Sequence, residues 1–307
     1  MKKLKIYANS VMVLLCLHMA AAAQSYFYND RYYDSPVLTE LGIGLGAMNC
    51  LTDLGGKTGI GKKFLKDINW QNTRFCASIN FTLTYKGLIA IRTEANYGQV
   101  TAADSLLKND ASVAGTRYLR NLSFKSTILE AYLGFEFHPL MLLHTFKENG
   151  ITLSPFIVAG IGIYNFNPQA YNGVSWINLA SLHTEGQGFA EYPDKKDYQL
   201  TQMNFPIGGG FKYEFSPVFN LRLELLYRIL KTDYLDDVSG SYADARSFHR
   251  NLNPTQAKLA EQMADRTKEL NPLLRNTAGT IRGNPDNKDA YFSISLKISF
   301  NLNRTER

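Results

Sequence analysis

Residues 219–239 read FNLRLELLYRILKTDYLDDVS, and their first half alternates between two kinds of side chain. One face carries Phe219, Leu221, Leu223, Leu225, Tyr227 and Ile229, and the other carries Asn220, Arg222, Glu224 and Arg228. A period of two residues predicts a β-strand. An apolar face opposite a charged face is typical of a transmembrane barrel, in which lipid covers the outside and a packed polar interior receives the charges.

Seven further segments alternate in the same way, at about residues 40–50, 75–85, 89–97, 124–138, 152–165, 202–215 and 291–302. The connections between them are alternately long and short. Long loops at one end and short turns at the other are the layout of an outer-membrane barrel with both termini in the periplasm. We therefore predict an all-β fold, an eight-stranded antiparallel transmembrane barrel over residues 38–302, in the outer membrane.

Outward aromatic residues fall into two bands along these strands. The turn side holds Tyr85, Phe137, Tyr213, Phe215, Phe219 and Phe300, and the loop side holds Phe75, Tyr97, Tyr227 and Phe292. Two aromatic girdles are expected where a barrel wall meets the two membrane–water interfaces. A soluble β-sandwich, the competing architecture, would not band its aromatic residues in this way.

Residues 1–23 have the pattern of a secretory signal peptide. They begin with three lysines, continue with a short apolar run and end in three alanines before Gln24, where we expect cleavage. Loss of the lysines lowers the formal net charge from +6 to +3. No later apolar run reaches 18 residues, which excludes membrane-spanning helices. Residues 24–37 and 303–307 are then a periplasmic N-terminal segment and a periplasmic tail.

The inward positions of the strands carry charges of both signs. The cations are Arg74, Lys86, Arg92, Lys212, Arg222, Arg228 and Lys297, and the anions are Glu94, Glu130, Glu136, Glu214 and Glu224. Eight strands enclose a space that side chains can fill. Because unpaired buried charge is costly, we expect these residues to form a lumen charge network that plugs the barrel.

Two cysteines, Cys50 and Cys76, remain after the signal peptide. Strand parity places both inward, near the loop-side ends of the first two strands. A disulfide that closes the first loop fits an oxidising compartment, and two buried free thiols are the alternative.

The sequence contains few patterns typical of a catalytic, nucleotide-binding or metal-binding site. The stretch GKTGIGKK (56–63) imitates a phosphate-binding loop, but Lys63 stands where Ser or Thr should hold magnesium, so we interpret it as a basic surface loop that can contact lipopolysaccharide. Glu130 and Glu136 lie about 20 Å apart on one strand, too far for an acid–base pair. We expect no enzymatic activity, cofactor, metal or nucleic acid; a lipase or acyltransferase is the alternative.

A helix is predicted inside the last loop. Asn253 is an N-cap followed by a proline, and Leu259, Met263 and Leu270 form an apolar stripe. We expect this helix to pack over the barrel mouth; binding of a partner is the alternative.

The second half of the opening stretch is an acidic corner of Thr232, Asp233, Tyr234, Asp236, Asp237 and Ser239. Its carboxylates can bind calcium, but the glycine and closing glutamate of a calcium loop are missing. We expect them instead to accept hydrogen bonds from backbone amides and so fix the entry of the last loop, with help from Arg228 or from residues 183–188.

Four segments together resemble the PorG-like outer-membrane β-barrel family of Bacteroidetes: PFIVAGIGIYNFNP (155–168), HTEGQG (183–188), TDYLDDVSGSYAD (232–244), and Arg282-Gly283 before a final strand. The chain departs from the family's Tyr-x-Gly-Asp-Leu run with CLTDL (50–54). The resemblance implies association with the type IX secretion system, in which such barrels help to couple periplasmic ring and core proteins to the outer membrane.

Two functions follow as hypotheses. The first is a non-enzymatic structural component of a type IX secretion system that binds partners through its periplasmic face. The second is a stand-alone surface barrel that binds lipid or another ligand through its extracellular loops.

Overall fold

The computed structural model describes residues 32–33, 37–54, 69–108, 114–142, 152–216, 218–303 and 305–306. The predicted signal peptide, the predicted basic loop at 56–63 and most of the predicted periplasmic N-terminal segment lie outside these residues.

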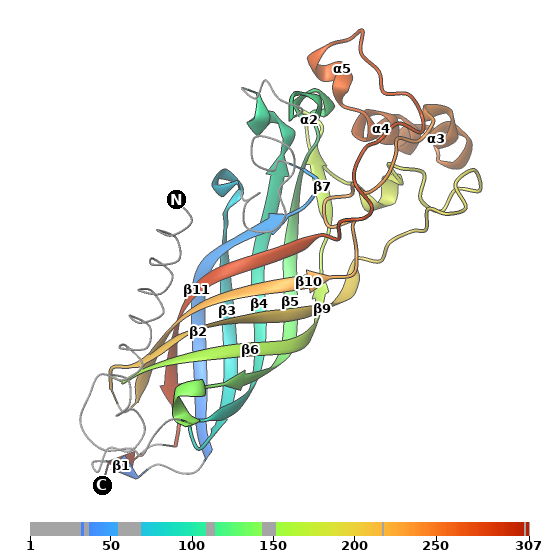
Figure 1. The fold of residues 1–307 in the computed structure, drawn as a ribbon. Helices are drawn as coiled ribbons and strands as arrows, with labels where there is room; N and C mark the ends of the chain where they lie inside the picture. The colour runs from blue at the N-terminus through green and yellow to red at the C-terminus, as the bar shows by residue number, and fades with distance from the viewer. Residues whose placement is uncertain are drawn as a thin grey trace, which may run out of the picture.

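Eight long antiparallel strands close into a barrel (Figure 1). They are β2 (Val37–Leu51), β3 (Arg74–Tyr85), β4 (Ile89–Ala103), β5 (Ser123–Phe137), β6 (Thr152–Asn165), β9 (Thr201–Glu214), β10 (Phe219–Leu230) and β11 (Ala290–Asn301). The strand order is β4-β3-β2-β11-β10-β9-β6-β5, and pairing of β4 with β5 closes the ring. The predicted eight-stranded antiparallel barrel is therefore confirmed.

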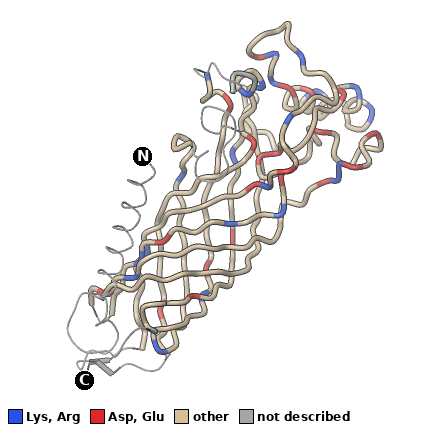
Figure 2. The backbone as a smooth tube through the Cα atoms, in the orientation of Figure 1, with Lys and Arg blue, Asp and Glu red and all other residues tan. Residues whose placement is uncertain are grey.

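The barrel wall has an apolar outside and a polar inside. Along β10 the inward side chains of Asn220, Arg222, Glu224 and Arg228 are buried, while Leu223 is half exposed on the outward face. Outward leucine, isoleucine and phenylalanine side chains remain exposed around the other strands as well. Such a surface is stable only when lipid covers it, so the chain is a membrane-spanning barrel of the bacterial outer-membrane type. Figure 2 shows charged residues gathered on the loops beyond one end of the wall.

The connections differ in length at the two ends. At the short-turn end, β3 runs into β4 after Tyr85, and β9 runs into β10 after Glu214. At this end Asn303 extends the wall: its side chain accepts a hydrogen bond from Thr39 N (2.9 Å) and donates one to Val37 O (2.6 Å). The two-residue strands β1 (Tyr32–Tyr33) and β12 (Thr305–Glu306) pair with each other.

The long-loop end carries the remaining elements. These are η2 (Trp70–Asn72), η3 (Asp104–Leu107), α2 (Ala114–Arg120), β7 (Pro168–Tyr171), β8 (Trp176–Asn178), η5 (Ala180–Leu182), α3 (Ala245–Asn251), α4 (Pro254–Ala264) and α5 (Thr267–Leu270), while η4 (Pro139–Leu142) lies at the short-turn end. No helix within the described residues is long and apolar enough to cross a membrane. We call residues 166–200 and 231–289 together the outer cap (Figure 1, yellow and orange to red).

The predicted helix is α4, and Asn253 caps it by accepting a hydrogen bond from Gln256 N (2.9 Å). Met263 is buried, but Leu270 belongs to the separate helix α5 and is exposed, so the predicted stripe is shorter than expected. The apolar side of α4 packs within the outer cap, against Leu179, Leu182, Phe189 and Phe248. The helix thus joins the last loop to the loop between β6 and β9.

One further expectation differs from the structure, and for the cysteines the structure shows the second of the two alternatives. Phe292 has outward parity but is buried, so it is not part of an exposed girdle. Cys50 and Cys76 are both free, buried thiols. The register explains the missing disulfide, because Cys76 lies opposite Gly46, four residues or about 13 Å along the strand from Cys50.

Candidate functional site

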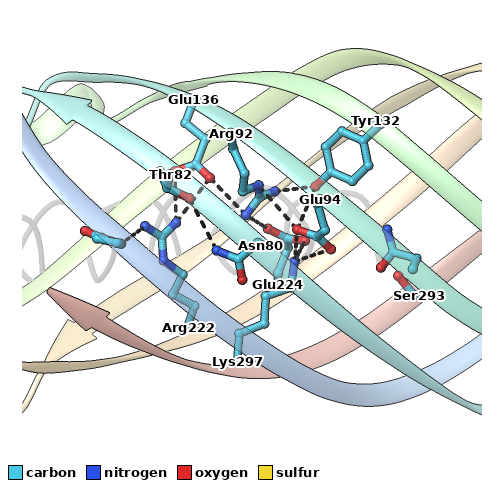
Figure 3. Close-up of polar contacts among 12 residues, drawn as sticks. Asn80, Thr82, Arg92, Glu94, Tyr132, Glu136, Arg222, Glu224, Ser293 and Lys297 are labelled. Atoms are coloured by element: carbon cyan, nitrogen blue, oxygen red, sulfur yellow. Dashed lines mark hydrogen bonds and ion pairs between the residues drawn. The ribbon is translucent and has the colours of Figure 1, made fainter. Parts of the chain in front are cut away.

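Two buried polar clusters distinguish this barrel: a charge network in the lumen, and a hydrogen-bonded hub in the outer cap. The lumen network fills the space inside the strands in three layers. Figure 3 shows the part of the network around Arg92 and Arg222.

The layer nearest the short turns joins Glu40 and Glu136 through Arg222. The guanidinium of Arg222 donates to Glu40 Oε2 (2.5 Å) and to both oxygens of Glu136 (3.1 and 2.9 Å). Lys212 donates to the other oxygen of Glu40. His138 lies 3.5 Å from Glu136. All of these side chains are buried, so each charge is neutralised by direct contact rather than by water.

The middle layer is built around Arg92. Its Nη1 lies 2.9 Å from Glu136 and 2.7 Å from Glu224, and its Nη2 donates to the hydroxyl of Tyr132 (2.7 Å), which donates in turn to Glu94 (3.0 Å). Lys297 donates to both Glu94 and Glu224. Figure 3 shows these side chains reaching across the lumen from separate strands. They therefore tie opposite walls of the barrel together.

The layer nearest the outer loops is the pair of Arg228 and Glu130, with Nη2 to Oε2 at 2.9 Å. Arg228 also donates to Ser293 Oγ (2.5 Å), and Glu130 accepts from Asn96 (3.0 Å) and Asn204 (2.6 Å). Glu130 and Glu136 therefore belong to different layers, each with its own arginine, as expected for ion-pair partners rather than a catalytic pair.

The charge balance of the lumen differs from the expectation in four residues. Arg74 and Lys86 are exposed at the two ends of β3, where the strand leaves the barrel interior, and Glu214 is only half buried, near Asn301 (3.3 Å). Glu40 was missed, although it shares the parity of Gly42 and lies on the inward face. Five buried cations, Arg92, Lys212, Arg222, Arg228 and Lys297, then meet five buried anions, Glu40, Glu94, Glu130, Glu136 and Glu224.

Glycine makes room for this network at Gly44. A Cβ at that position would lie 2.7 Å from Cγ of Lys297 and 2.5 Å from Ser78 Oγ. The bare backbone of β2 therefore lets the Lys297 chain lie flat against the wall and reach its two carboxylates.

The hub of the outer cap is the buried carboxylate of Glu185, from the HTEGQG segment. It accepts hydrogen bonds from Ser239 N and Gly240 N and from Arg282 Nη1, each at 3.0 Å. Arg282 also donates to Asp237 O (2.6 Å) and to Ala264 O (3.3 Å). The ion pair of Glu185 and Arg282 thus connects the loop between β6 and β9 with both halves of the loop between β10 and β11.

The acidic corner is part of this hub, and its hydrogen bonds agree with the expected anchoring role. Asp236 accepts from Leu54 N (3.2 Å) and Val238 N (2.9 Å). Asp237 has a positive φ of 66° and accepts from Thr184 Oγ1 (2.5 Å) and Tyr198 Oη (2.7 Å). One helper residue, Thr184, therefore comes from the HTEGQG segment, and a second, Tyr198, follows it in the same loop. Arg228 instead pairs with Glu130 in the lumen.

The other corner residues close the turn locally. Thr232 Oγ1 accepts from Tyr234 N (3.1 Å), and the ring of Tyr234 stacks on Tyr198 with the centroids 4.8 Å apart. Asp233 is buried, and this burial raises the pKa of its carboxyl to about 7. Burial likewise raises the pKa of Asp237 to about 6, although Arg282 opposes the change.

Arg120 connects the hub to the neighbouring loops. It forms a two-pronged pair with Asp104 (2.8 Å for both contacts) and donates to Arg282 O (2.5 Å) and Asp53 O (2.8 Å). The Asp53 carboxylate accepts from Asn284 N (2.6 Å). The CLTDL segment therefore joins the same cluster, even though its sequence departs from the family pattern. No sequence signal identified Arg120 or Asp104, whose partners lie far away in the chain.

Both clusters are built from ion pairs and hydrogen bonds that connect separate strands and loops. Within the described ranges, no three His, Cys, Asp or Glu side chains gather in a way that would hold a metal ion. The carboxylates of Glu185 in the hub and of the five buried glutamates in the lumen accept contacts from arginine, lysine, amide and hydroxyl donors.

Comparisons with known proteins found neither a matching family model nor a matching curated protein. Among solved structures, Neisserial surface protein A is 9% identical, with 87% of this chain and 98% of that chain covered and a TM-score of 0.36. Ail, the attachment invasion locus protein of Yersinia pestis, is 8% identical, with 88% and 100% covered and a TM-score of 0.36. The outer membrane protein OprG from Pseudomonas aeruginosa is 8% identical, with 90% and 98% covered and a TM-score of 0.35.

Proposed function

We propose that this protein is a non-enzymatic structural component of a type IX protein secretion system, which couples periplasmic ring and core proteins to the outer membrane. One observation carries the proposal. HTEGQG, TDYLDDVS and Arg282-Gly283, three of the four segments that resemble the PorG-like family, build a single buried cluster around Glu185. Because distant segments must fit each other to form such a hub, their joint occurrence supports kinship with that family more strongly than any one motif does.

The packed lumen supports a scaffold rather than a transporter. Five cations and five anions inside the wall are buried and in contact with one another. A solute would have to break these buried pairs to pass, at a cost of about 3–5 kcal/mol each. Function then rests on the two ends of the barrel, and the short-turn end faces the periplasm, where secretion-system partners would bind.

A deletion strain tests the secretion role. We expect loss of the gene to leave type IX cargo in the periplasm, and the wild-type gene to restore export. A Glu191→Ala variant is a matched control, because Glu191 is an outer-cap carboxylate whose partners among the described residues, Arg250 and Asn251, are exposed. It should restore export fully. Normal cargo export in the deletion strain would refute the proposal.

Chemical cross-linking from the periplasmic side tests partner binding separately. We expect a cysteine placed at Lys86, in the exposed β3–β4 turn, to cross-link to a periplasmic protein, and one placed at Lys258, on the exposed side of α4, to give no such product. Equal labelling at both positions would contradict a periplasmic docking face.

The alternative, a stand-alone barrel that binds lipid or a ligand through its outer loops, is favoured by exposed aromatic residues on the β7–β8 hairpin. Under this alternative, cargo export continues in the deletion strain.

A further inference from the structure

The β7–β8 hairpin continues the outward face of the barrel wall beyond the membrane. β7 pairs with β5 at Lys125 and Gln169, and β8 pairs with β7 at Gln169 and Asn178. Side chains of paired residues share a face, and parity along β5 places Lys125 on the same side as the lipid-facing Leu129, which is 59% exposed. The lipid-facing surface is therefore continuous with one face of the hairpin.

That face presents two aromatic rings and a cation. Tyr171 and Trp176 lie opposite each other, with ring centroids 5.5 Å apart, and are 42% and 47% exposed. The ammonium of Lys125 lies 3.6 Å from the centroid of the Trp176 ring. Within the described part of the chain, Lys125 has no carboxylate partner. The opposite face of the hairpin carries Ala170, which is buried in the apolar cluster inside the outer cap.

The turn of the hairpin fixes this arrangement. Asn172 Oδ1 accepts hydrogen bonds from Val174 N (2.9 Å) and Ser175 N (2.8 Å), and Gly173 takes the positive φ of 95°. Val174 at the tip is 85% exposed. The exposed Val174, Tyr171 and Trp176 together form an apolar and aromatic surface that is able to contact a partner.

The height of the β7–β8 hairpin above the membrane identifies its partner. Leu129 is level with Tyr97 of the loop-side girdle, which marks the membrane–water interface. Lys125 lies four residues further along β5, about 13 Å along a strand that tilts by about 40°. This places the hairpin about 10 Å above the girdle, beyond the acyl chains and among the head groups of the outer leaflet.

We propose that Lys125, Tyr171 and Trp176 form a binding site for the phosphorylated saccharide head group of an outer-leaflet glycolipid, namely lipopolysaccharide. The aromatic rings contact the sugar, and the ammonium of Lys125, which lies over one face of the Trp176 ring, pairs with a phosphate. This site is independent of the secretion role, because it lies on the outer side and its loss need not alter periplasmic binding.

Trp176 can report on the site directly. The chain has two tryptophans, and Trp70 is 65% exposed, so a Trp70→Phe background leaves Trp176 as the single emitter. Purified protein in detergent micelles is titrated with lipopolysaccharide, with the same lipopolysaccharide after enzymatic dephosphorylation, and with phosphatidylglycerol. We expect lipopolysaccharide to shift the Trp176 emission to shorter wavelength in a saturable manner, and phosphatidylglycerol, which has phosphate without the sugar, to produce no saturable shift.

Lys125→Gln should weaken the apparent affinity for lipopolysaccharide by about fivefold and leave the affinity for the dephosphorylated form unchanged. Lys125→Arg should bind like the parent, which shows that the fold tolerates substitution here. Lys258→Gln, at an exposed lysine on α4, should have no effect. An equal response to phosphatidylglycerol, no response to lipopolysaccharide, or equal behaviour of Lys125→Gln and Lys258→Gln would overturn the site.

Discussion

Replacement of Glu185 by alanine should open the outer cap and leave the barrel intact. The change removes the acceptor of two backbone amides, Ser239 N and Gly240 N, and the partner of Arg282. Each buried group left without a partner costs about 1–3 kcal/mol, and loss of one member of a buried ion pair costs about 3–5 kcal/mol. Because Arg282 keeps its bond to Asp237 O, we take about 4 kcal/mol for the whole change, or roughly 1,000-fold in the opening equilibrium.

Limited trypsin digestion of the folded protein in detergent measures this opening. When opening and closing are fast compared with cleavage, the cleavage rate follows the open population. We expect cleavage after cap residues such as Lys195 and Arg250 to accelerate by about 100- to 1,000-fold in Glu185→Ala. The barrel strands should stay protected.

Two variants sharpen the test. Glu185→Gln keeps the shape and one acceptor oxygen but loses the charge opposite Arg282, so its effect should lie between those of wild type and Glu185→Ala. Glu191→Ala, at an exposed pair with Arg250, should digest at the wild-type rate. Cap cleavage in Glu185→Ala at the rate of Glu191→Ala would show that Glu185 is not the anchor.

Three further expectations concern the same cap and the barrel beneath it. Burial raises the pKa of Asp233 to about 7 from an ordinary 3.8. Its contribution to the stability of the outer cap is therefore fully present below pH 4 and is lost as the pH rises through 7. With an acid-tolerant protease in place of trypsin, cap cleavage should be faster at pH 8 than at pH 5, and pH-independent protection would contradict this. Gly283→Ala should destabilise the outer cap by about 1–3 kcal/mol, because the new Cβ would meet a carboxylate oxygen at 2.4 Å and a carbonyl oxygen at 2.7 Å. Gly240→Ala should be tolerated in the same digestion assay, because the nearest neighbour of its new Cβ lies at 3.6 Å. The denatured, unreduced protein should take up an alkylating group at both Cys50 and Cys76, and a mass without either adduct would reveal a disulfide.

The wall of the barrel could be predicted from the sequence because its signal is local. Side chains alternate with a period of two, and a residue's face follows from counting along one strand, as for Arg222 and Glu224 in β10. The errors fall where strands end. Arg74 and Lys86 have the parity of the lumen, but at the rim of the wall a long side chain turns to solvent. Glu40 also lies near a strand end, three residues after β2 begins, but its side chain points inward and is buried.

The outer cap could not be predicted in this way, because its hub depends on contacts between distant residues. Glu185 contacts Ser239 and Arg282, which lie 54 and 97 residues away in the chain. No periodic pattern places such residues together. Resemblance to a family singled out the segments, but their positions relative to one another became visible only in the structure. The same reason accounts for Arg120, whose bonds reach three separate loops.

A packed lumen is expected of a scaffold and not of a transporter. Ion conductance across a planar lipid bilayer tests most directly whether the lumen is packed. Purified protein that has inserted and folded should add no stepwise current above the baseline of the bilayer, because Arg92, Glu224 and their partners occupy the lumen as buried ion pairs. Reproducible single-channel openings with a defined ion selectivity would contradict the packed lumen and the scaffold role together.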